Sequence, residues 1–415
     1  MAITGIGIIS PAGVGKDAFW DVLRNGRSCV DYITRFDTEH TNVKIAAEIK
    51  KQILPRYPKP KTPRDLSRVA RYALLAAHLA LQDSELDLKS ISPSRIGTVI
   101  GTSVGGLEDA GNSYNRFVLR APKGVGIDAD FTLDYQLSFF TGSLVKNINV
   151  TYGLEGRSDL ISTGCAASAD AIGNAFENIQ YNSADIILAG GTEAPINLYT
   201  LKAFDVMLAL STRDDSPEKA SRPFDRKRSG FVMGEGAAIL VLEELEHAKQ
   251  RGAHIYCEVA AYQTSCDAYH QTASDPKQEQ AARAIMEALR STDLLPESVA
   301  YVSAHGTSTT INDRQETYLI KKVFDHHAYT LPISSIKSMV GHSSGAAGAM
   351  QAVSCALIFE TNTVPPTINY EYPDPECDLD YVPNQARPWD GSVILQNTFG
   401  FSGKNTALIY RRFEN

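Results

Sequence analysis

The stretch STGCAASADAIG, residues 162–173, surrounds one cysteine with small residues and carries a single charge. The residues SDLI at 158–161 predict the end of a strand, and the Ala-rich run 166–181 predicts a helix. Cys165 is therefore expected at a strand-to-helix turn, where the free N–H groups of a helix N-terminus lower a thiol pKa. Its small neighbours would let a substrate carbonyl approach. This turn makes a nucleophile as plausible as the alternative, a buried cysteine that packs as a small hydrophobe, and the rest of the chain must decide between them.

Strand-like and helical runs alternate along the 415 residues, which predicts an α/β fold with a largely parallel sheet. A first half, residues 1–253, ends with the run GAAILVLEELEHAKQRGA. A second half, residues 254–415, begins with HIYCEVAAY and repeats the alternation of strand-like and helical runs. Glycine-terminated strands near 97–106 and 393–405 suggest an internal duplication.

Composition excludes several classes of function. With 43% hydrophobic and 21% charged residues the chain should form a sizeable core, and its net charge of −8 disfavours nucleic acid as a partner. Six scattered cysteines without CxxC indicate neither a disulfide framework nor a zinc site, and without HExxH we expect no metal. The N-terminus lacks a basic signal region and no apolar run could cross a membrane, so we expect a cytoplasmic protein.

The Gly-rich start GIGIISPAGVGK fits no nucleotide-binding motif. Ser10 stands where a P-loop requires glycine, and Asp17 stands where it requires Ser or Thr. Ser10 also replaces the third glycine of the dinucleotide-binding pattern, and GxSxG is absent from the chain.

Two further Gly- and Ser-rich stretches place reactive side chains after predicted strands. His305 in AHGTSTTINDRQE (304–316) follows VAYVS, and SSIKSMVGHSSGAAGAM (334–350) carries His342. Because the carboxyl ends of parallel strands meet on one face of a sheet, Cys165 and both histidines are expected to converge. Either histidine alone could be structural, but the three together favour a site.

One cysteine and two histidines suit a particular chemistry. A Cys–His pair alone would serve acyl transfer or amide hydrolysis. A second histidine suits a step in which charge grows on a thioester oxygen, because two N–H donors can stabilise an enolate. Decarboxylation of a malonyl thioester needs this, and the enolate can then attack an acyl group held on cysteine. The constellation predicts a Claisen condensation.

The chain resembles the β-ketoacyl synthases of the thiolase superfamily over essentially its full length. The matching motifs include TGIGIISPAG, STGCAAS, ILAGGTEAPI, SRPFD, GFVMGEGAAILVLEE, AHGTSTTINDRQE, SSIKSMVGHSSGAAGA and NTFGFSGKN. The resemblance implies a thiolase-like fold with duplicated βαβαβαββ halves in a five-layer αβαβα architecture. CDAYHQT and PPTINYEYPDPECDLDYVP most resemble the catalytic α ketosynthase of type II aromatic polyketide synthases, and fatty-acid ketosynthases match these segments less well.

The resemblance implies roles for the matching residues. Cys165 would accept the acyl group, with its own backbone N–H and that of Phe401 as the oxyanion hole. His305 and His342, as neutral rings that donate from Nε2, would bind the malonyl thioester carbonyl. Phe401 would also be the gating aromatic at the pocket entrance. The family usually has GFGG there, and Ser402 in the GFSG of this chain is expected to stiffen the loop.

Four more residues match supporting positions. Lys337 and Glu316 would organise the histidines, although a purely structural role is the alternative for each. Thr307 and Thr309 match threonines that contact a phosphopantetheine arm.

The resemblance also implies partners. No cofactor would be bound permanently, since the phosphopantetheine arm is carried by an acyl carrier protein. The basic side chains of Lys61, Arg64 and Arg68 are expected to contact that acidic carrier. A homologous chain-length factor (the ketosynthase β subunit) would complete a heterodimer. The alternatives are a homodimeric fatty-acid or polyene-type elongating synthase and, less favoured because Cys165 is present, a non-catalytic chain-length partner.

Overall fold

The computed structural model describes residues 1–50, 66–108, 111 and 140–414. Within these residues, eleven strands form one sheet in the order β11-β10-β14-β15-β9-β1-β8-β7-β5-β6, with β2 paired to β1. The strands are β1 (Ala2–Ser10), β2 (Gly13–Val14), β5 (Ile96–Gly101), β6 (Ser158–Ile161), β7 (Ile186–Glu193), β8 (Gly236–Glu243), β9 (Cys257–Cys266), β10 (Tyr301–Ser303), β11 (Ile333–Ser334), β14 (Val393–Gly400) and β15 (Lys404–Arg411). Two small separate pairs are β3 (Asp31–Tyr32) with β4 (Ile45–Ala46) and β12 (Thr363–Val364) with β13 (Arg387–Pro388).

The sheet repeats itself on either side of the junction between β1 and β9. On one side, β1 pairs antiparallel with β8 and β8 with β7, and then β7 pairs parallel with β5 and β5 with β6. On the other side, β9 pairs antiparallel with β15 and β15 with β14, and then β14 pairs parallel with β10 and β10 with β11. The predicted duplication is therefore present. The prediction of a largely parallel sheet is wrong, because the central strands from β14 to β7 all pair antiparallel and only the outer pairs are parallel. The two glycine-terminated strands that suggested the duplication, β5 and β14, are not equivalent, however, because β14 corresponds to β7 in the other half. Each terminal glycine is explained by a close approach of neighbouring backbone. A Cβ on Gly101 would lie 2.4 Å from the carbonyl carbon of Ala167, and one on Gly400 would lie 3.0 Å from the carbonyl oxygen of Thr163.

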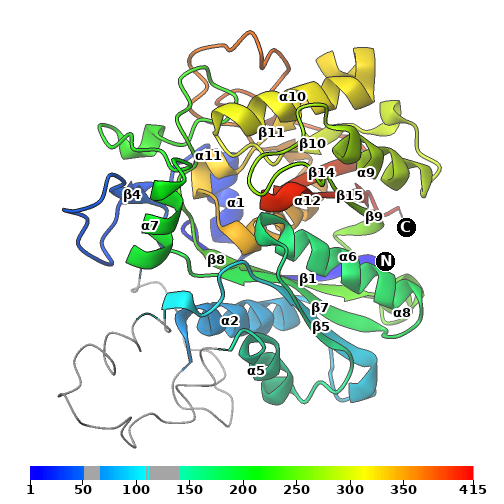
Figure 1. The fold of residues 1–415 in the computed structure, drawn as a ribbon. Helices are drawn as coiled ribbons and strands as arrows, with labels where there is room; N and C mark the ends of the chain where they lie inside the picture. Colours follow the sequence, from blue (N-terminus) through cyan, green and yellow to red (C-terminus); the bar gives the residue numbers. More distant parts are fainter. Residues whose placement is uncertain (51–65, 109–110, 112–139, 415) are drawn as a thin grey trace, which may run out of the picture.

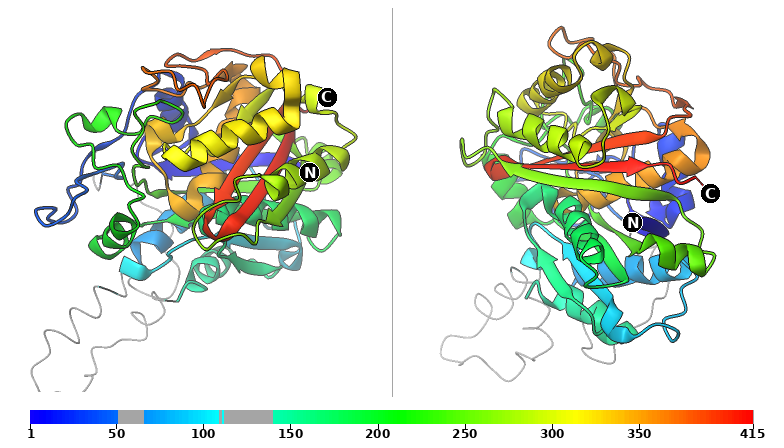
Figure 2. Two further views of the ribbon diagram at one scale, coloured as in Figure 1. Left: turned by 45° about the horizontal axis from the view of Figure 1, so that its top comes forward. Right: turned by 90° about the vertical axis from the view of Figure 1, so that its right-hand side faces the viewer.

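Helices cover and separate the two halves of the sheet (Figures 1 and 2). One outer face carries α2 (Arg68–Asp83) and α5 (Ser143–Tyr152), and the other carries α9 (Glu279–Arg290) and α10 (Thr310–Phe324). Between the halves lie α6 (Ala167–Gln180) and α12 (Ala347–Thr361), which confirms the five-layer αβαβα fold. The remaining labelled helices are α1 (Lys16–Arg24), α7 (Leu198–Val206), α8 (Leu245–Gln250) and α11 (Lys337–Val340).

Small residues allow the two central helices to pack closely. A Cβ on Gly348 of α12 would lie 2.7 Å from the backbone nitrogen of Ala169 in α6, so glycine is required at this crossing. The N–H of Ala349 donates to Ser168 Oγ at 2.9 Å. Helix α12 is buried on all sides from Ala347 to Phe359, as expected for a helix without a polar stripe. In the described part of the chain, no helix combines the length and apolar character needed to span a membrane.

Candidate active site

A cavity of about 500 Å³ brings together the reactive side chains predicted from the sequence. Its wall includes Cys165, His305, His342 and Phe401. The ring centroids of the two histidines are 5.5 Å apart and their planes are nearly perpendicular, at 89°. The cysteine comes from the first half of the chain and the histidines from the second. The described residues hold no group of three His, Cys, Asp or Glu side chains suited to a metal ion.

Cys165 occupies the turn that the small-residue pattern predicts. It lies in a 3-10 turn, Gly164–Ala166, between β6 and α6, and the φ of +63° at Gly164 favours glycine. The end of β14 packs against this turn, since a Cβ on Gly400 would lie 3.0 Å from the carbonyl oxygen of Thr163. The backbone of Phe401, the next residue, is therefore held beside the cysteine turn.

The environment of the thiol differs from the prediction. Burial raises the pKa of Cys165 to about 12, although the charge of Lys337 acts in the opposite direction. The predicted lowering of this pKa is wrong, because the side chain is only 9% exposed and desolvation disfavours the thiolate. Burial therefore disfavours the thiolate, and any acylation of Cys165 has to include the removal of the thiol proton.

The main chain of His305 is held from both sides. Its N–H donates to Glu316 Oε1 at 2.8 Å, and the N–H of Gly306 donates to Glu316 Oε2 at 2.7 Å. The Lys337 ammonium donates to the carbonyl oxygen of His305 at 2.6 Å. Both charged side chains thus contact the backbone that carries the ring, an arrangement that fixes its position.

His342 is held by a different set of contacts. It follows Gly341, whose φ is +70°. Its N–H donates to the carbonyl of Val232 at 2.7 Å, and its carbonyl accepts from the N–H of Gly234 at 2.9 Å. Its ring lies edge-on to that of Phe231, with centroids 5.2 Å apart.

Both imidazoles are neutral. Burial, assisted by the charge of Lys337, lowers the pKa of His305 and His342 well below the ordinary value. The Nδ1 atom of each ring is buried without a hydrogen-bond partner among the described residues, which leaves Nε2 as the nitrogen that can face the cavity. A neutral ring protonated at Nε2 can donate a hydrogen bond to an oxygen bound there.

The two threonines also line the cavity. The hydroxyls of Thr307 and Thr309 are 2.9 Å apart, on the segment between β10 and α10. Thr309 in addition caps α10, because its hydroxyl accepts the N–H of Asn312 at 3.3 Å.

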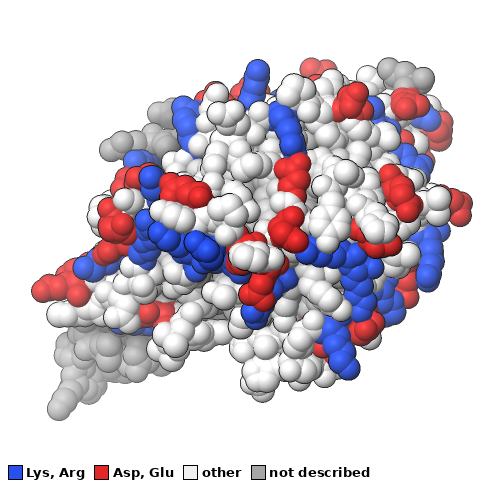
Figure 3. Space-filling view, turned by 90° about the horizontal axis from the view of Figure 1, so that it is seen from above, with Lys and Arg blue, Asp and Glu red and all other residues white. Residues whose placement is uncertain are grey.

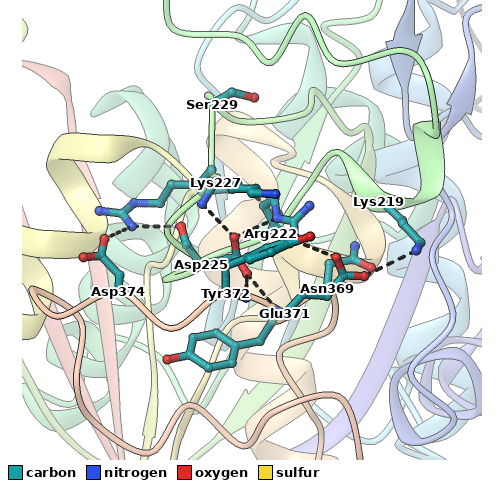
Figure 4. Close-up of polar contacts among 12 residues, drawn as sticks. Lys219, Arg222, Asp225, Lys227, Ser229, Asn369, Glu371, Tyr372 and Asp374 are labelled. Carbon is teal, nitrogen blue, oxygen red and sulfur yellow. Dashed lines mark hydrogen bonds and ion pairs between the residues drawn. The ribbon is translucent and has the colours of Figure 1, made fainter.

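A network of ion pairs and hydrogen bonds joins Arg222 to Asp225 and Glu371 (Figure 4). Arg222, fully buried, donates from Nε to Asp225 Oδ1 at 3.0 Å, and Asp225 Oδ2 accepts the N–H of Tyr372 at 2.6 Å. Arg228 donates to the carbonyl of Thr309 at 3.1 Å. The SRPFD motif and the residues after it therefore tie the Tyr372 segment to the threonine segment.

Phe401 is 39% exposed and lies at the cavity wall, with its ring centroid 6.3 Å from that of Phe204. The next residue, Ser402, has a φ of +69°, a conformation that favours glycine. Its N–H and its Oγ both donate to the carbonyl of Gln271, at 2.8 and 3.2 Å. These bonds fasten the Phe401 loop to the 271–274 segment, part of which lines the cavity.

Ser402→Gly should loosen this loop with little change in global stability, because glycine loses the Oγ bond but adopts the positive φ without strain. Amide exchange in a peptide covering 399–404 should accelerate by about fivefold, the equivalent of one hydrogen bond of about 1 kcal/mol. Hydrogen–deuterium exchange with mass spectrometry measures this, with Ser402→Ala separating the lost hydroxyl from the freed backbone. Unchanged exchange in both variants would show that the serine does not hold the loop.

The predicted carrier-protein contact at Arg68 is wrong. Arg68 is buried at the start of α2, where it donates to Glu235 at 2.7 Å and to Glu108 at 2.8 Å. Because its acidic partners come from segments far along the chain, the sequence pattern could not reveal them. Lys61 and Arg64 lie outside the described residues. On the face seen in Figure 3, basic and acidic side chains are interspersed.

Two buried polar residues at the site were not predicted from the sequence. Glu193 accepts the N–H of Ser103 at 2.6 Å and that of Gly345 at 3.0 Å, which joins the two halves of the chain. Gln351 accepts a hydrogen bond from Lys337 at 3.2 Å. The only local signal for either is a polar residue inside an apolar run, in ILAGGTEAPI and AGAMQAVSCALIF.

Comparison with protein families gives two matches. Residues 1–248 match the β-ketoacyl synthase N-terminal domain, and residues 256–371 match the β-ketoacyl synthase C-terminal domain.

Individual proteins are similar over nearly the whole chain. A putative polyketide β-ketoacyl synthase 1 of Streptomyces cyaneus is 44% identical over 99% of this chain and 97% of its own length. A 3-oxoacyl-[acyl-carrier-protein] synthase 2 of Synechocystis is 40% identical over 100% and 98%. Among solved structures, the chain is similar to one chain in the complex of a type II polyketide synthase acyl carrier protein with its ketosynthase bound to the hexaketide. The TM-score is 0.91 at 37% identity, and the match covers 100% of this chain and 99% of that chain. The ishigamide ketosynthase/chain length factor gives 0.90 at 34% identity, with the same coverage.

Proposed function

Because the chain belongs to the β-ketoacyl synthase family, we propose that it condenses malonyl-acyl carrier protein with an acyl or polyketide chain held on Cys165. It is an acyltransferase of the 3-oxoacyl synthase type. The observation that carries the proposal is the single cavity in which a buried thiol from residues 1–253 lies with two neutral histidines from residues 254–415.

The first step loads the enzyme. The Cys165 sulfur attacks the carbonyl carbon of an acyl thioester, and the N–H groups of Cys165 and Phe401 stabilise the oxyanion. As the new S–C bond forms, the bond to the carrier thiol breaks, and the proton of Cys165 ends on that departing thiol.

The second step forms the carbon–carbon bond. Nε2–H of His305 and of His342 donate to the thioester oxygen of the malonyl group, while Thr307 and Thr309 contact the phosphopantetheine arm. The bond to the malonyl carboxylate breaks, CO₂ leaves, and its electron pair forms the enolate. The enolate carbon attacks the acyl carbonyl, the S–C bond to Cys165 breaks, and the Cys165 thiolate that leaves takes up a proton from solvent. Lys337 and Glu316 act by holding the backbone of His305.

The carrier protein supplies the phosphopantetheine, so this chain needs no permanently bound cofactor. We place the enzyme in the cytoplasm, where malonyl-loaded carrier protein is its substrate.

We further propose that the chain is the catalytic α subunit of a type II polyketide synthase, paired with a homologous chain-length factor. The resemblance to the Streptomyces cyaneus synthase and to the ishigamide ketosynthase/chain length factor supports this assignment. A homodimeric fatty-acid or polyene-type synthase is the second candidate, supported by the 40% identity to the Synechocystis enzyme.

Co-expression distinguishes the two candidates. Alone, the chain should be poorly soluble or inactive, whereas with a homologous subunit and malonyl-loaded carrier it should yield a carrier-bound poly-β-ketone, detected by intact mass. A monodisperse homodimer that extends a fatty acyl group by one two-carbon unit would instead establish the fatty-acid-type function.

Neither histidine should make the condensation rate fall between about pH 7.5 and pH 6, whereas Glu316, whose pKa burial raises to about 7, can do so. Since the pKa of each histidine is lowered well below 6.5, both rings stay neutral and able to donate as the pH falls through that range. Initial rates in buffers of constant ionic strength test this. A fall in rate with its midpoint near pH 6.5 that persists in Glu316→Gln would show that a ring with an ordinary pKa takes part.

A further inference from the structure

Gln351 of α12 is a buried amide at the back of the site, and every polar atom of its side chain is used. The two hydrogens of its Nε2 are shared among three carbonyls, those of Ser303 at 3.2 Å, Ala304 at 3.0 Å and Asn397 at 3.2 Å. Its Oε1 accepts from the Lys337 ammonium at 3.2 Å. One side chain therefore joins the ends of β10, β14 and α11.

These contacts close a ring around His305. Ala304 directly precedes His305, and Lys337 donates to the His305 carbonyl at 2.6 Å. Asn397 Nδ2 lies 3.5 Å from Glu316 Oε1, the oxygen that accepts the His305 N–H. Gln351 thus contacts directly or through one residue each group that holds the main chain of His305.

The neutrality of Gln351 matters as much as its position. Both hydrogen-bond acceptors of the buried Lys337 ammonium, the His305 carbonyl and the Gln351 amide oxygen, are uncharged. Among the described residues no carboxylate lies within ion-pair distance of Lys337, and the titratable groups that face it are Glu316, Asp313, Cys165 and the two histidines.

We propose that Gln351 is a positioning residue for the condensation: its amide fixes the backbone that carries His305 and leaves Lys337 bonded to neutral partners only. This inference rests on the proposed function for its kinetic effect. An amide is needed because one side chain must donate to carbonyls and accept from an ammonium, which neither a carboxylate nor an apolar side chain does.

The first test uses Gln351→Met, similar in size but without polar bonds, and Ser354→Ala as its control on the same helix, where a buried hydroxyl without a partner is removed. Condensation by Gln351→Met should fall by about tenfold or more while acylation of Cys165, followed by intact mass, changes less than about threefold. The control should match the wild type in both. Equal condensation rates in Gln351→Met and wild type would overturn the proposal, as would a parallel loss of both steps.

The second test needs no substrate and so separates this proposal from the proposed function. Gln351→Glu places a carboxylate beside Lys337, which should raise the pKa of Lys337 by about one unit or more. The ε-methylene NMR signal of Lys337 in ¹³C-lysine-labelled protein, assigned with Lys337→Met, measures that pKa directly. An unchanged pKa in folded Gln351→Glu would overturn the proposal even if Gln351→Met failed to fold, and a wild type without condensation would count against the proposed function alone.

Discussion

Cys165→Ala should lower condensation by roughly 10⁴-fold or more and abolish the acyl-enzyme, because Cys165 is the one cysteine among the described residues that line the cavity. The two histidines remain in this variant. Slow decarboxylation of malonyl-carrier protein to acetyl-carrier protein should therefore continue when condensation has stopped. Intact-mass analysis of enzyme and carrier follows both reactions in one sample.

A second cysteine provides the control for this variant. Cys29→Ala removes a partly buried thiol outside the cavity and should leave both reactions unchanged. An acyl adduct that persists in Cys165→Ala would show that the nucleophile is elsewhere in the chain.

His305→Ala and His342→Ala should each lower malonyl decarboxylation by about 10²- to 10³-fold, the usual effect of removing one donor to an oxyanion. Acylation of Cys165 should be affected much less, because we propose that backbone N–H groups, and not the histidines, bind the oxyanion of that step. The contacts of Glu316 and Lys337 to residue 305 involve only the main chain and should survive the substitution. Decarboxylation measured as release of CO₂, beside acyl-enzyme formation measured by mass, separates the two effects.

His326→Ala, at an exposed position outside the cavity, is the matched control and should behave as wild type. If either active-site variant lost acylation and decarboxylation equally, the division of work between cysteine and histidines would be contradicted.

The local elements of the site could be read from the sequence because local patterns determine them. Small residues around Cys165 predict the turn at Gly164–Ala166, and the run after it forms α6 within one residue of the predicted bounds. His305 follows β10 as predicted, whereas the short helix α11 separates His342 from β11, so His342 does not stand directly at a strand end as expected. The order of the strands then brings these segments to one cavity.

What the sequence could not show depends on contacts between distant segments. The raised pKa of Cys165 comes from burial, which no local pattern reports. Arg68 looks like a basic surface residue until Glu235 of a distant segment is placed beside it. Gln351 stands in an apolar helix, and its partners come from β10, β14 and α11. Such residues become visible only when the two halves are packed together.

The most direct test of the account is a two-stage mass measurement on the wild-type protein. Incubation with an acyl-loaded carrier should add one acyl group to the peptide that contains Cys165, and later addition of malonyl-carrier should remove it as a β-ketoacyl-carrier product appears with the release of CO₂. An acyl group on another residue, or one on Cys165 that malonyl-carrier does not discharge, would contradict the central claim.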